Sequence, residues 1–193
     1  MYNSRYIRNL FVYNKWGKKL VKENILDVGC DRGYMRDRYK NYIGIDISGN
    51  PDIIVDLEKG YIPFKPNTFQ VVICLDVLEH LDNLHEVLNQ IVDISKEFII
   101  LSFPNEIRWL NLVRYIFKTN DREFGLTPTN RHKWFLSYTQ CRKFILDFAK
   151  KKNLEIYDEY VVLGPVSKIF HKLLKWKFPN LMPYAYFVVL QHK

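Results

Sequence analysis

Short apolar segments, each bounded by polar or turn residues, recur along the first half of the chain. Within each segment consecutive residues are apolar, so both faces of an extended strand would be apolar, as parallel strands covered by helices require. Two further strands are predicted near the carboxyl end, at about 154–163 and 184–190. The five earlier segments that predict buried strands are 24–28, 42–45, 53–55, 71–75 and 98–101.

Apolar residues at helical spacing lie between these strands. A stripe with i, i+3, i+4 and i+7 spacing predicts a helix over 84–94, and Asn83 and Glu86 have the spacing of a capping box at its start. Ser137 and Gln140 repeat that spacing ahead of a second helix. Alternating strands and helices predict an α/β fold with a mainly parallel sheet.

The amino-terminal residues mix arginine and lysine with apolar residues at helical spacing. They predict a helical extension within 1–22, with Gly17 as its expected C-terminal stop. A second basic amphipathic helix is predicted over 164–178. No linker or repeat interrupts the sequence, and its length predicts one domain over 1–193.

The composition limits the class of protein. Apolar residues make up 48% and charged residues 26%, which is typical of a globular domain. No apolar run approaches the roughly 18 residues of a membrane-spanning helix. The three cysteines, Cys30, Cys74 and Cys141, are too widely spaced for a disulfide set or a zinc knuckle. These features together predict a cytoplasmic protein without a transmembrane segment.

The charge is basic, with 29 Lys and Arg against 21 Asp and Glu, a net +8, and aromatic residues reach 16%. Such a surface suits nucleic acid, an anionic metabolite or a membrane surface. A solvated basic face without a ligand has the same composition. Charge alone therefore leaves the partner open.

Glycines and acids follow the first three predicted strands. Gly29 and Gly33 lie at a strand-to-helix turn, where the backbone can approach a ligand closely. Asp46 ends the second strand, 46 − 27 = 19 residues after Asp27, close to the roughly 20 expected of a ribose-binding acid. Asp56 follows the third strand. This pattern predicts a nucleoside-binding edge of the sheet.

The segment Leu26-Asp27-Val28-Gly29-Cys30-x-x-Gly33 resembles the first motif of class I S-adenosylmethionine-dependent methyltransferases. The resemblance continues through Asp56-Leu57-Glu58 and 71–81 to Ser102-Phe103-Pro104-Asn105. It implies methyl transfer from S-adenosylmethionine. It also implies a Rossmann-like seven-stranded, mainly parallel sheet with helices on both faces and an antiparallel last strand.

The same resemblance implies which residues bind the cofactor. Asp31 occupies the place of a glycine in the family motif, and aspartate is among the few residues that tolerate a left-handed backbone conformation. The implied cofactor-binding residues are Asp27, Gly29, Cys30, Gly33, Asp46, Ile47, Asp56, Leu57, Leu75 and Asp76.

The turn after the fourth predicted strand carries Asp76, Glu79 and His80, at i, i+3 and i+4. It is similar to the turn of two metal-dependent branches, the ubiquinone-biosynthesis O-methyltransferases and the small-RNA 3′-end 2′-O-methyltransferases. That similarity implies a metal site of Asp76, Glu79, His80 and the later His132, for Mg, Mn or Zn. Two alternatives stay open: Glu79 and His80 orient the loop, or His80 acts as a metal-free catalytic base with Glu79 beside it.

The resemblance leaves the acceptor open. We expect O-methylation of a small-molecule acceptor, with 106–135 and 164–183 as candidate acceptor-side inserts. Their basic residues favour an anionic acceptor. One alternative is an RNA ribose 2′-O-methyltransferase. Another is an accessory S-adenosylmethionine-binding protein similar to the methionine-biosynthesis MetW family, which would act with a partner enzyme.

Overall fold

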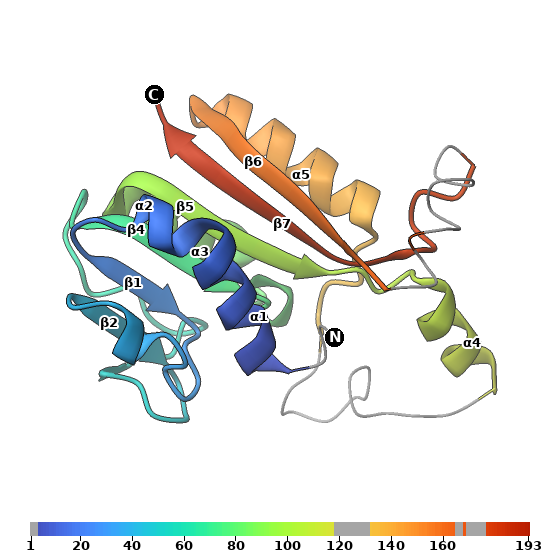
Figure 1. Cartoon of the computed structure of the whole chain (residues 1–193), viewed down its shortest axis with the longest axis horizontal. Helices are drawn as coiled ribbons and strands as arrows, with labels where there is room; N and C mark the ends of the chain where they lie inside the picture. Colours follow the sequence, from blue (N-terminus) through green and yellow to red (C-terminus); the bar gives the residue numbers. More distant parts are fainter. Residues whose placement is uncertain (1–3, 118–131, 165–167, 169–176) are drawn as a thin grey trace.

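A seven-stranded sheet lies at the centre of the computed structural model, which describes residues 4–117, 132–164, 168 and 177–193 (Figure 1). The strand order is β3-β2-β1-β4-β5-β7-β6. Neighbouring strands from β3 to β5 pair in parallel, whereas β7 pairs antiparallel with both β5 and β6. The expected sheet with a reversed last strand is confirmed. The strands are β1 (Ile25–Val28), β2 (Tyr42–Asp46), β3 (Ile53–Ile54), β4 (Phe69–Leu75), β5 (Ser95–Pro104), β6 (Leu154–Leu163) and β7 (Pro183–His192).

Helices cover both faces of the sheet, because alternate residues of its central strands belong to two separate cores. One core packs the sheet against α3 (Leu84–Ile94) and α5 (Tyr138–Lys151). The other packs it against the amino-terminal helical segment, which lies in front of the sheet in Figure 1. That segment consists of α1 (Arg5–Val12), the π-helical η1 (Tyr13–Gly17) and α2 (Lys18–Leu20).

The amino-terminal helix does not end at Gly17, so that prediction is wrong. Gly17 has helical backbone angles, and the helical segment continues to Leu20. A Cβ atom on Gly17 would lie 1.9 Å from the hydroxyl oxygen of Tyr39. The glycine is therefore needed for close packing rather than for a helix stop.

The two predicted capping boxes have different outcomes. Ser137 and Gln140 form both reciprocal hydrogen bonds at the start of α5, which confirms the capping box predicted there. At α3, Asn83 makes no side-chain cap, and its amide donates to the carbonyl of Leu57 at 2.8 Å. The box at Asn83 and Glu86 is therefore wrong, because the asparagine joins two loops at the carboxyl edge of the sheet.

Short connections shape that edge. The link between β1 and β2 contains only the 3₁₀ turn η2 (Arg36–Arg38), and η3 (Leu78–His80) follows β4. After β5, α4 (Trp109–Phe117) begins the insert predicted over 106–135. The amphipathic helix predicted over 164–178 falls almost wholly outside the described residues. Among the described residues, no helix is both long and apolar enough to cross a membrane.

Candidate active site

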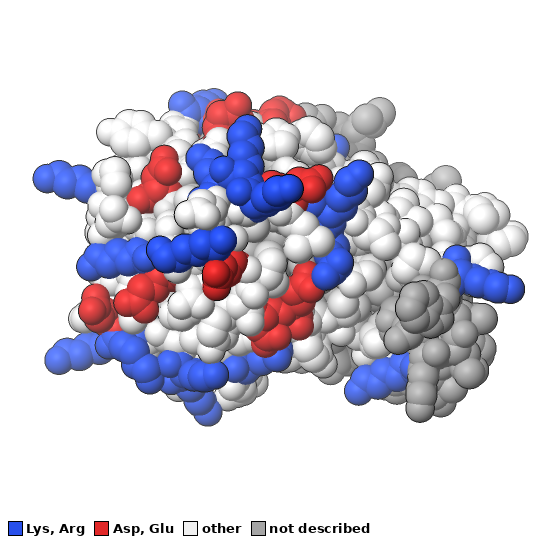
Figure 2. All heavy atoms as spheres, turned by 90° about the horizontal axis from the view of Figure 1, so that it is seen from above, with Lys and Arg blue, Asp and Glu red and all other residues white. Residues whose placement is uncertain are grey.

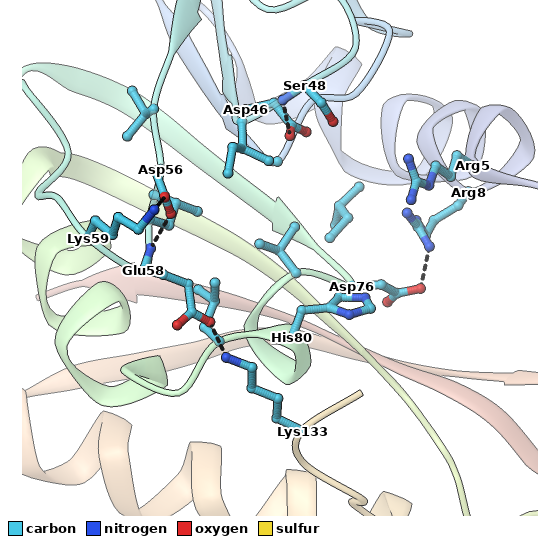
Figure 3. Close-up of a pocket in the computed structure, with 17 residues that line it drawn as sticks. Arg5, Arg8, Asp46, Ser48, Asp56, Glu58, Lys59, Asp76, His80 and Lys133 are labelled. Carbon is cyan, nitrogen blue, oxygen red and sulfur yellow. Dashed lines mark hydrogen bonds and ion pairs between the residues drawn. The ribbon is translucent and has the colours of Figure 1, made fainter. Parts of the chain in front are cut away.

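A cavity of about 670 Å³ opens at the carboxyl ends of β1, β2 and β4 (Figure 3). Parallel strands bring their carboxyl ends to one edge, and ligands of open α/β sheets bind there. Three of the predicted cofactor residues, Asp27, Cys30 and Gly33, do not line this cavity. The predicted residues that line it are Gly29, Asp46, Ile47, Asp56, Leu57, Leu75 and Asp76.

Backbone amides hold the Asp46 carboxylate at the end of β2. The Asp31 amide donates to one carboxylate oxygen at 2.8 Å, and the Ser48 amide donates to the other at 3.2 Å. Asp31 reaches this position with a φ of 51°, the left-handed conformation expected of it, and Gly29 has a φ of 76°. The turn after β1 therefore fixes the acid that the motif assigns to a ribose.

Asp27 lies in the sheet rather than in the cavity wall. It is buried, and it accepts a hydrogen bond from the Tyr42 hydroxyl at 2.9 Å. Burial raises its pKa to about 6, and the Tyr42 hydrogen bond opposes part of that shift. Asp27 therefore links β1 to β2 through Tyr42 and does not line the cavity.

Two arginines of α1 also line the cavity, and the sequence analysis did not identify them. Arg5 forms an ion pair with Asp31 at 2.9 Å, and Arg8 pairs with Asp76 (Figure 3). Asp76 has a φ of 51° and accepts a second hydrogen bond from the Ser102 hydroxyl. The only signal in the sequence is the i, i+3 spacing of the two arginines on a basic helix.

A second cavity of about 420 Å³ adjoins the first. The two share Arg5, Arg8, Asp76 and His80, so His80 lies where they meet. The other residues that line the second cavity are Ser4, Glu79, Pro104, Asn105, Glu106, Arg108, Asn111, Arg114, His132 and Tyr184.

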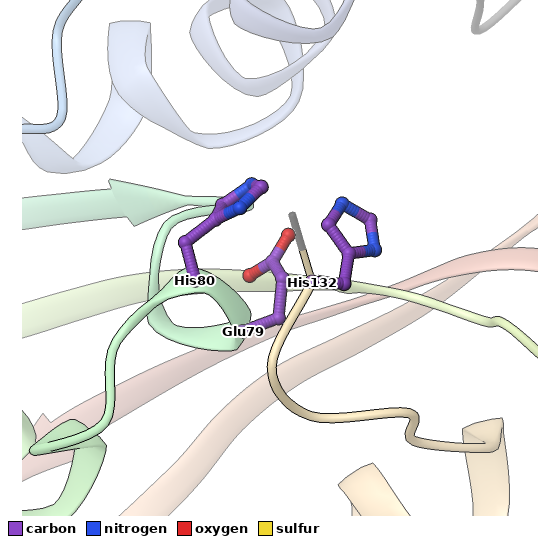
Figure 4. Close-up of side chains that lie close together, drawn as sticks. All are labelled: Glu79, His80 and His132. Carbon is purple, nitrogen blue, oxygen red and sulfur yellow. The ribbon is translucent and has the colours of Figure 1, made fainter. Parts of the chain in front are cut away.

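Glu79, His80 and His132 converge on this second cavity (Figure 4). Their ligand-type atoms all lie within 4.8 Å of one another, and the two imidazole centroids are 4.6 Å apart. Glu79 is 1% exposed, and neither of its carboxylate oxygens has a hydrogen-bond partner among the described residues. Burial, followed by the nearby Asp76 carboxylate, raises the Glu79 pKa well above its ordinary value. One carboxylate and two imidazoles form a set that could hold a divalent metal ion.

Asp76, predicted as a fourth ligand, is not part of this group. The i, i+3 and i+4 spacing does not bring Asp76 to Glu79 and His80 as a helical turn would, because Asp76 is left-handed and the 3₁₀ turn η3 begins only at Leu78. Its carboxylate binds Arg8 and the Ser102 hydroxyl instead.

His132 reaches the group because its neighbours are bound to η3. The amides of Lys133 and Trp134 donate to the backbone carbonyl of Glu79, at 2.8 and 3.2 Å. The Lys133 ammonium also pairs with Glu58 and Asp82, at 2.6 Å each. A segment more than fifty residues later in the chain is thereby fixed beside the turn after β4.

Glu106 is a further site residue that the sequence analysis did not identify. One of its carboxylate oxygens lies 2.6 Å from Nδ1 of His132, and the residue is 3% exposed. The side-chain amide of Asn111 donates to the other oxygen at 3.2 Å. Glu106 therefore orients the imidazole of His132, and its only signal is its position directly after Pro104-Asn105.

A family model described as a methyltransferase domain matches residues 3–142. No curated protein is similar enough to match the chain.

Solved structures share the fold. An S-adenosylmethionine-dependent methyltransferase from Archaeoglobus fulgidus is 18% identical, with a TM-score of 0.61 over 97% of this chain and 94% of that chain. Magnesium protoporphyrin IX methyltransferase from Synechocystis PCC 6803, with bound S-adenosylhomocysteine, is 17% identical, with a TM-score of 0.60 over 97% of this chain and 82% of that one. The small RNA methyltransferase HEN1 is 17% identical, with a TM-score of 0.65 over 97% of this chain but 25% of its own.

The matched family model spans more than half of the chain, and it covers β1 to β5. The resemblance inferred from the motifs at 26–33 and 71–81 is therefore confirmed. The chain belongs to the S-adenosylmethionine-dependent methyltransferase family.

Proposed function

We propose that this methyltransferase transfers a methyl group to a hydroxyl group of a small-molecule acceptor bound in the second cavity. The observation that carries the proposal is the junction of the two cavities at His80 and Asp76. A cofactor in the first cavity and an acceptor in the second would meet there. Proximity of the two reactants is the main requirement of a methyl transfer.

The first cavity fits the cofactor. Asp46 lies at a strand end with both oxygens held by amides, so it is oriented to accept hydrogen bonds from the two ribose hydroxyls. Asp56, which follows β3, also lines the cavity, and one of its carboxylate oxygens lies 3.3 Å from Nζ of Lys59. A side chain at Gly29 would collide with Val77, at 2.2 Å, so the turn must keep its glycine. When bound, S-adenosylmethionine supplies a methyl group activated by a sulfonium charge.

His80 is suited to take the proton of the acceptor hydroxyl, because it lines both cavities. Glu79 and His132 lie beside it, and Glu106 holds His132. The buried Glu79 carboxylate, with neither oxygen bonded to a described residue, fits a divalent ion. With such an ion, Glu79, His80 and His132 would be its ligands, and the ion would lower the pKa of the acceptor hydroxyl. Without an ion, His80 would take the proton itself.

The same three residues also suit an RNA ribose 2′-O-methyltransferase, and the structural similarity to HEN1 favours that second candidate. On the face that Figure 2 shows, Lys and Arg are interspersed with Asp and Glu. That face therefore forms no uninterrupted basic surface for RNA. An accessory role without an acceptor is less well supported, because a second cavity adjoins the first.

Substitution of His80 tests the proposed chemistry. We expect H80A to lower kcat by roughly a hundredfold to ten-thousandfold, as loss of a general base does, while the affinity for S-adenosylhomocysteine changes little. H85A is the matched control, because His85 lies on α3 outside both cavities, with its ring beside those of Trp134 and Phe144. Equal kcat values for H80A and the wild type would exclude His80 as the base.

Metal dependence is measured on the same protein. After chelation we expect activity to fall and to return with Mg²⁺, Mn²⁺ or Zn²⁺. Manganese binding, followed by electron paramagnetic resonance, should be lost in E79Q. Full activity of the chelated enzyme would leave His80 as a metal-free base. If S-adenosylmethionine itself does not bind, by calorimetry, the assignment of the first cavity fails.

A further inference from the structure

The second cavity carries more positive charge than the chemistry of the active site uses. Its three acidic residues belong to that site: Asp76 pairs with Arg8, Glu106 contacts His132, and Glu79 lies within 4.8 Å of His80 and His132. Two arginines of the α4 region, Arg108 and Arg114, line the same cavity. These arginines have no part in holding the cofactor, because neither lines the first cavity.

Arg108 is held in a fixed orientation. Its Nε donates to the side-chain oxygen of Asn111 at 2.8 Å, and its guanidinium lies 4.2 Å from the ring centroid of Tyr184. Asn111 is 4% exposed and also donates to Glu106, so the same buried network holds the arginine and the active-site acid. A guanidinium held in this way can make a two-point contact with a planar or tetrahedral anion.

Arg114 provides a second positive charge in the lining of the second cavity. It lies on α4 after Arg108, and both line the second cavity. Within residues 4–117, 132–164, 168 and 177–193, no carboxylate forms an ion pair with Arg114. A cavity of about 420 Å³ has the size of a site for one small ligand.

We infer that the acceptor carries a carboxylate or phosphate group that binds Arg108 and Arg114 while its hydroxyl lies at His80. The inference rests on the proposed function, because it assigns the second cavity to the acceptor. It adds a class of substrate: a small hydroxylated anion rather than a neutral alcohol or phenol. The two arginines would set which molecules are methylated, and His80 would act on the hydroxyl.

Calorimetric titration with inorganic phosphate tests the anion site directly, on the full chain saturated with S-adenosylhomocysteine. R108Q and R114Q should each weaken phosphate binding roughly tenfold to a hundredfold, as loss of one charge-assisted contact does. K151Q, at an exposed lysine that ends α5, removes one positive charge elsewhere and should leave phosphate binding unchanged. The affinity for S-adenosylhomocysteine should stay the same in all three variants, which also reports on folding.

Methylation of matched acceptors measures the same selectivity. We expect 3-hydroxybenzoate to be methylated with a higher kcat/KM than 3-hydroxybenzamide, and R114Q should remove most of that preference. Equal phosphate affinity in the wild type and in R108Q/R114Q would overturn the inference while S-adenosylhomocysteine still binds. Loss of cofactor binding in the wild type would instead overturn the proposed function. If R108Q/R114Q lost affinity for a short RNA while its phosphate binding was unchanged, RNA would replace the small anion as the proposed acceptor.

Discussion

The two adjoining cavities are built in different ways. The first is lined mainly by residues at the carboxyl ends of consecutive strands and in the loops that follow them, all between Gly29 and Leu81. The second combines α1, η3, the residues after β5, α4, and the segment at His132. The first cavity, which we propose for the cofactor, therefore depends mostly on one stretch of chain, whereas the second, proposed for the acceptor, depends on packing between distant segments. Substitutions in the two cavities should accordingly have separable effects.

The largest effect is expected for D46A, which should affect the first cavity alone. D46A removes the carboxylate that we propose binds both ribose hydroxyls. It also leaves the Asp31 and Ser48 amides without their acceptor. Affinity for S-adenosylmethionine should fall roughly a hundredfold to ten-thousandfold, while phosphate still binds the second cavity. Calorimetry measures both ligands. D37N, at an exposed residue of η2, is the control, and equal losses in D37N and D46A would contradict a specific role of Asp46.

R8Q tests the contact between the cavities. Arg8 and Asp76 are only 14% and 13% exposed, so removing the arginine leaves a carboxylate that is largely out of water. We expect the free energy of unfolding to fall by about 3 kcal/mol, as measured by urea denaturation. R5Q is the matched control, because Arg5 is 51% exposed and its ion pair with Asp31 should contribute less than about 1 kcal/mol.

The double variant R8Q/D76N sharpens this test. It removes both charges, so part of the lost stability should return. Equal unfolding free energies of R8Q and R5Q would show that the Arg8–Asp76 ion pair stabilises the fold no more than the exposed Arg5–Asp31 pair does.

Behind the first cavity, D27N should differ from the wild type in how its stability depends on pH. Burial raises the Asp27 pKa from 3.8 to about 6, so the folded state favours the protonated acid. Stability from this group is present below about pH 4 and is lost as the pH rises through about 6. Relative to D27N, which does not titrate, the wild type should lose up to about 3 kcal/mol between about pH 4 and pH 7. Urea denaturation of both proteins across this range measures the difference in their unfolding free energies. A difference that does not vary with pH would contradict the raised pKa of Asp27.

Local pattern was sufficient where one segment decides the outcome. The apolar segments predict all seven strands, and the box at Ser137 and Gln140 forms as expected. The same spacing failed at Asn83, because its side-chain amide donates to the Leu57 carbonyl and its side-chain oxygen does not cap the helix. Gly17 failed as a helix stop for a similar reason, since the neighbour that it accommodates, Tyr39, comes from another part of the chain. Spacing records what a segment can do alone and omits the partners that folding supplies.

The sequence by itself determined the fold class and the family, because β-strand ends and their glycine turns are encoded within short stretches. Only the tertiary structure brought Arg8 to Asp76 and His132 to Glu79, across 68 residues and 53 residues of chain. It also moved Asp76 out of the proposed metal group and brought Glu106 to His132. These contacts depend on how helices and loops pack over the sheet, and packing between distant segments leaves no fixed spacing in the sequence.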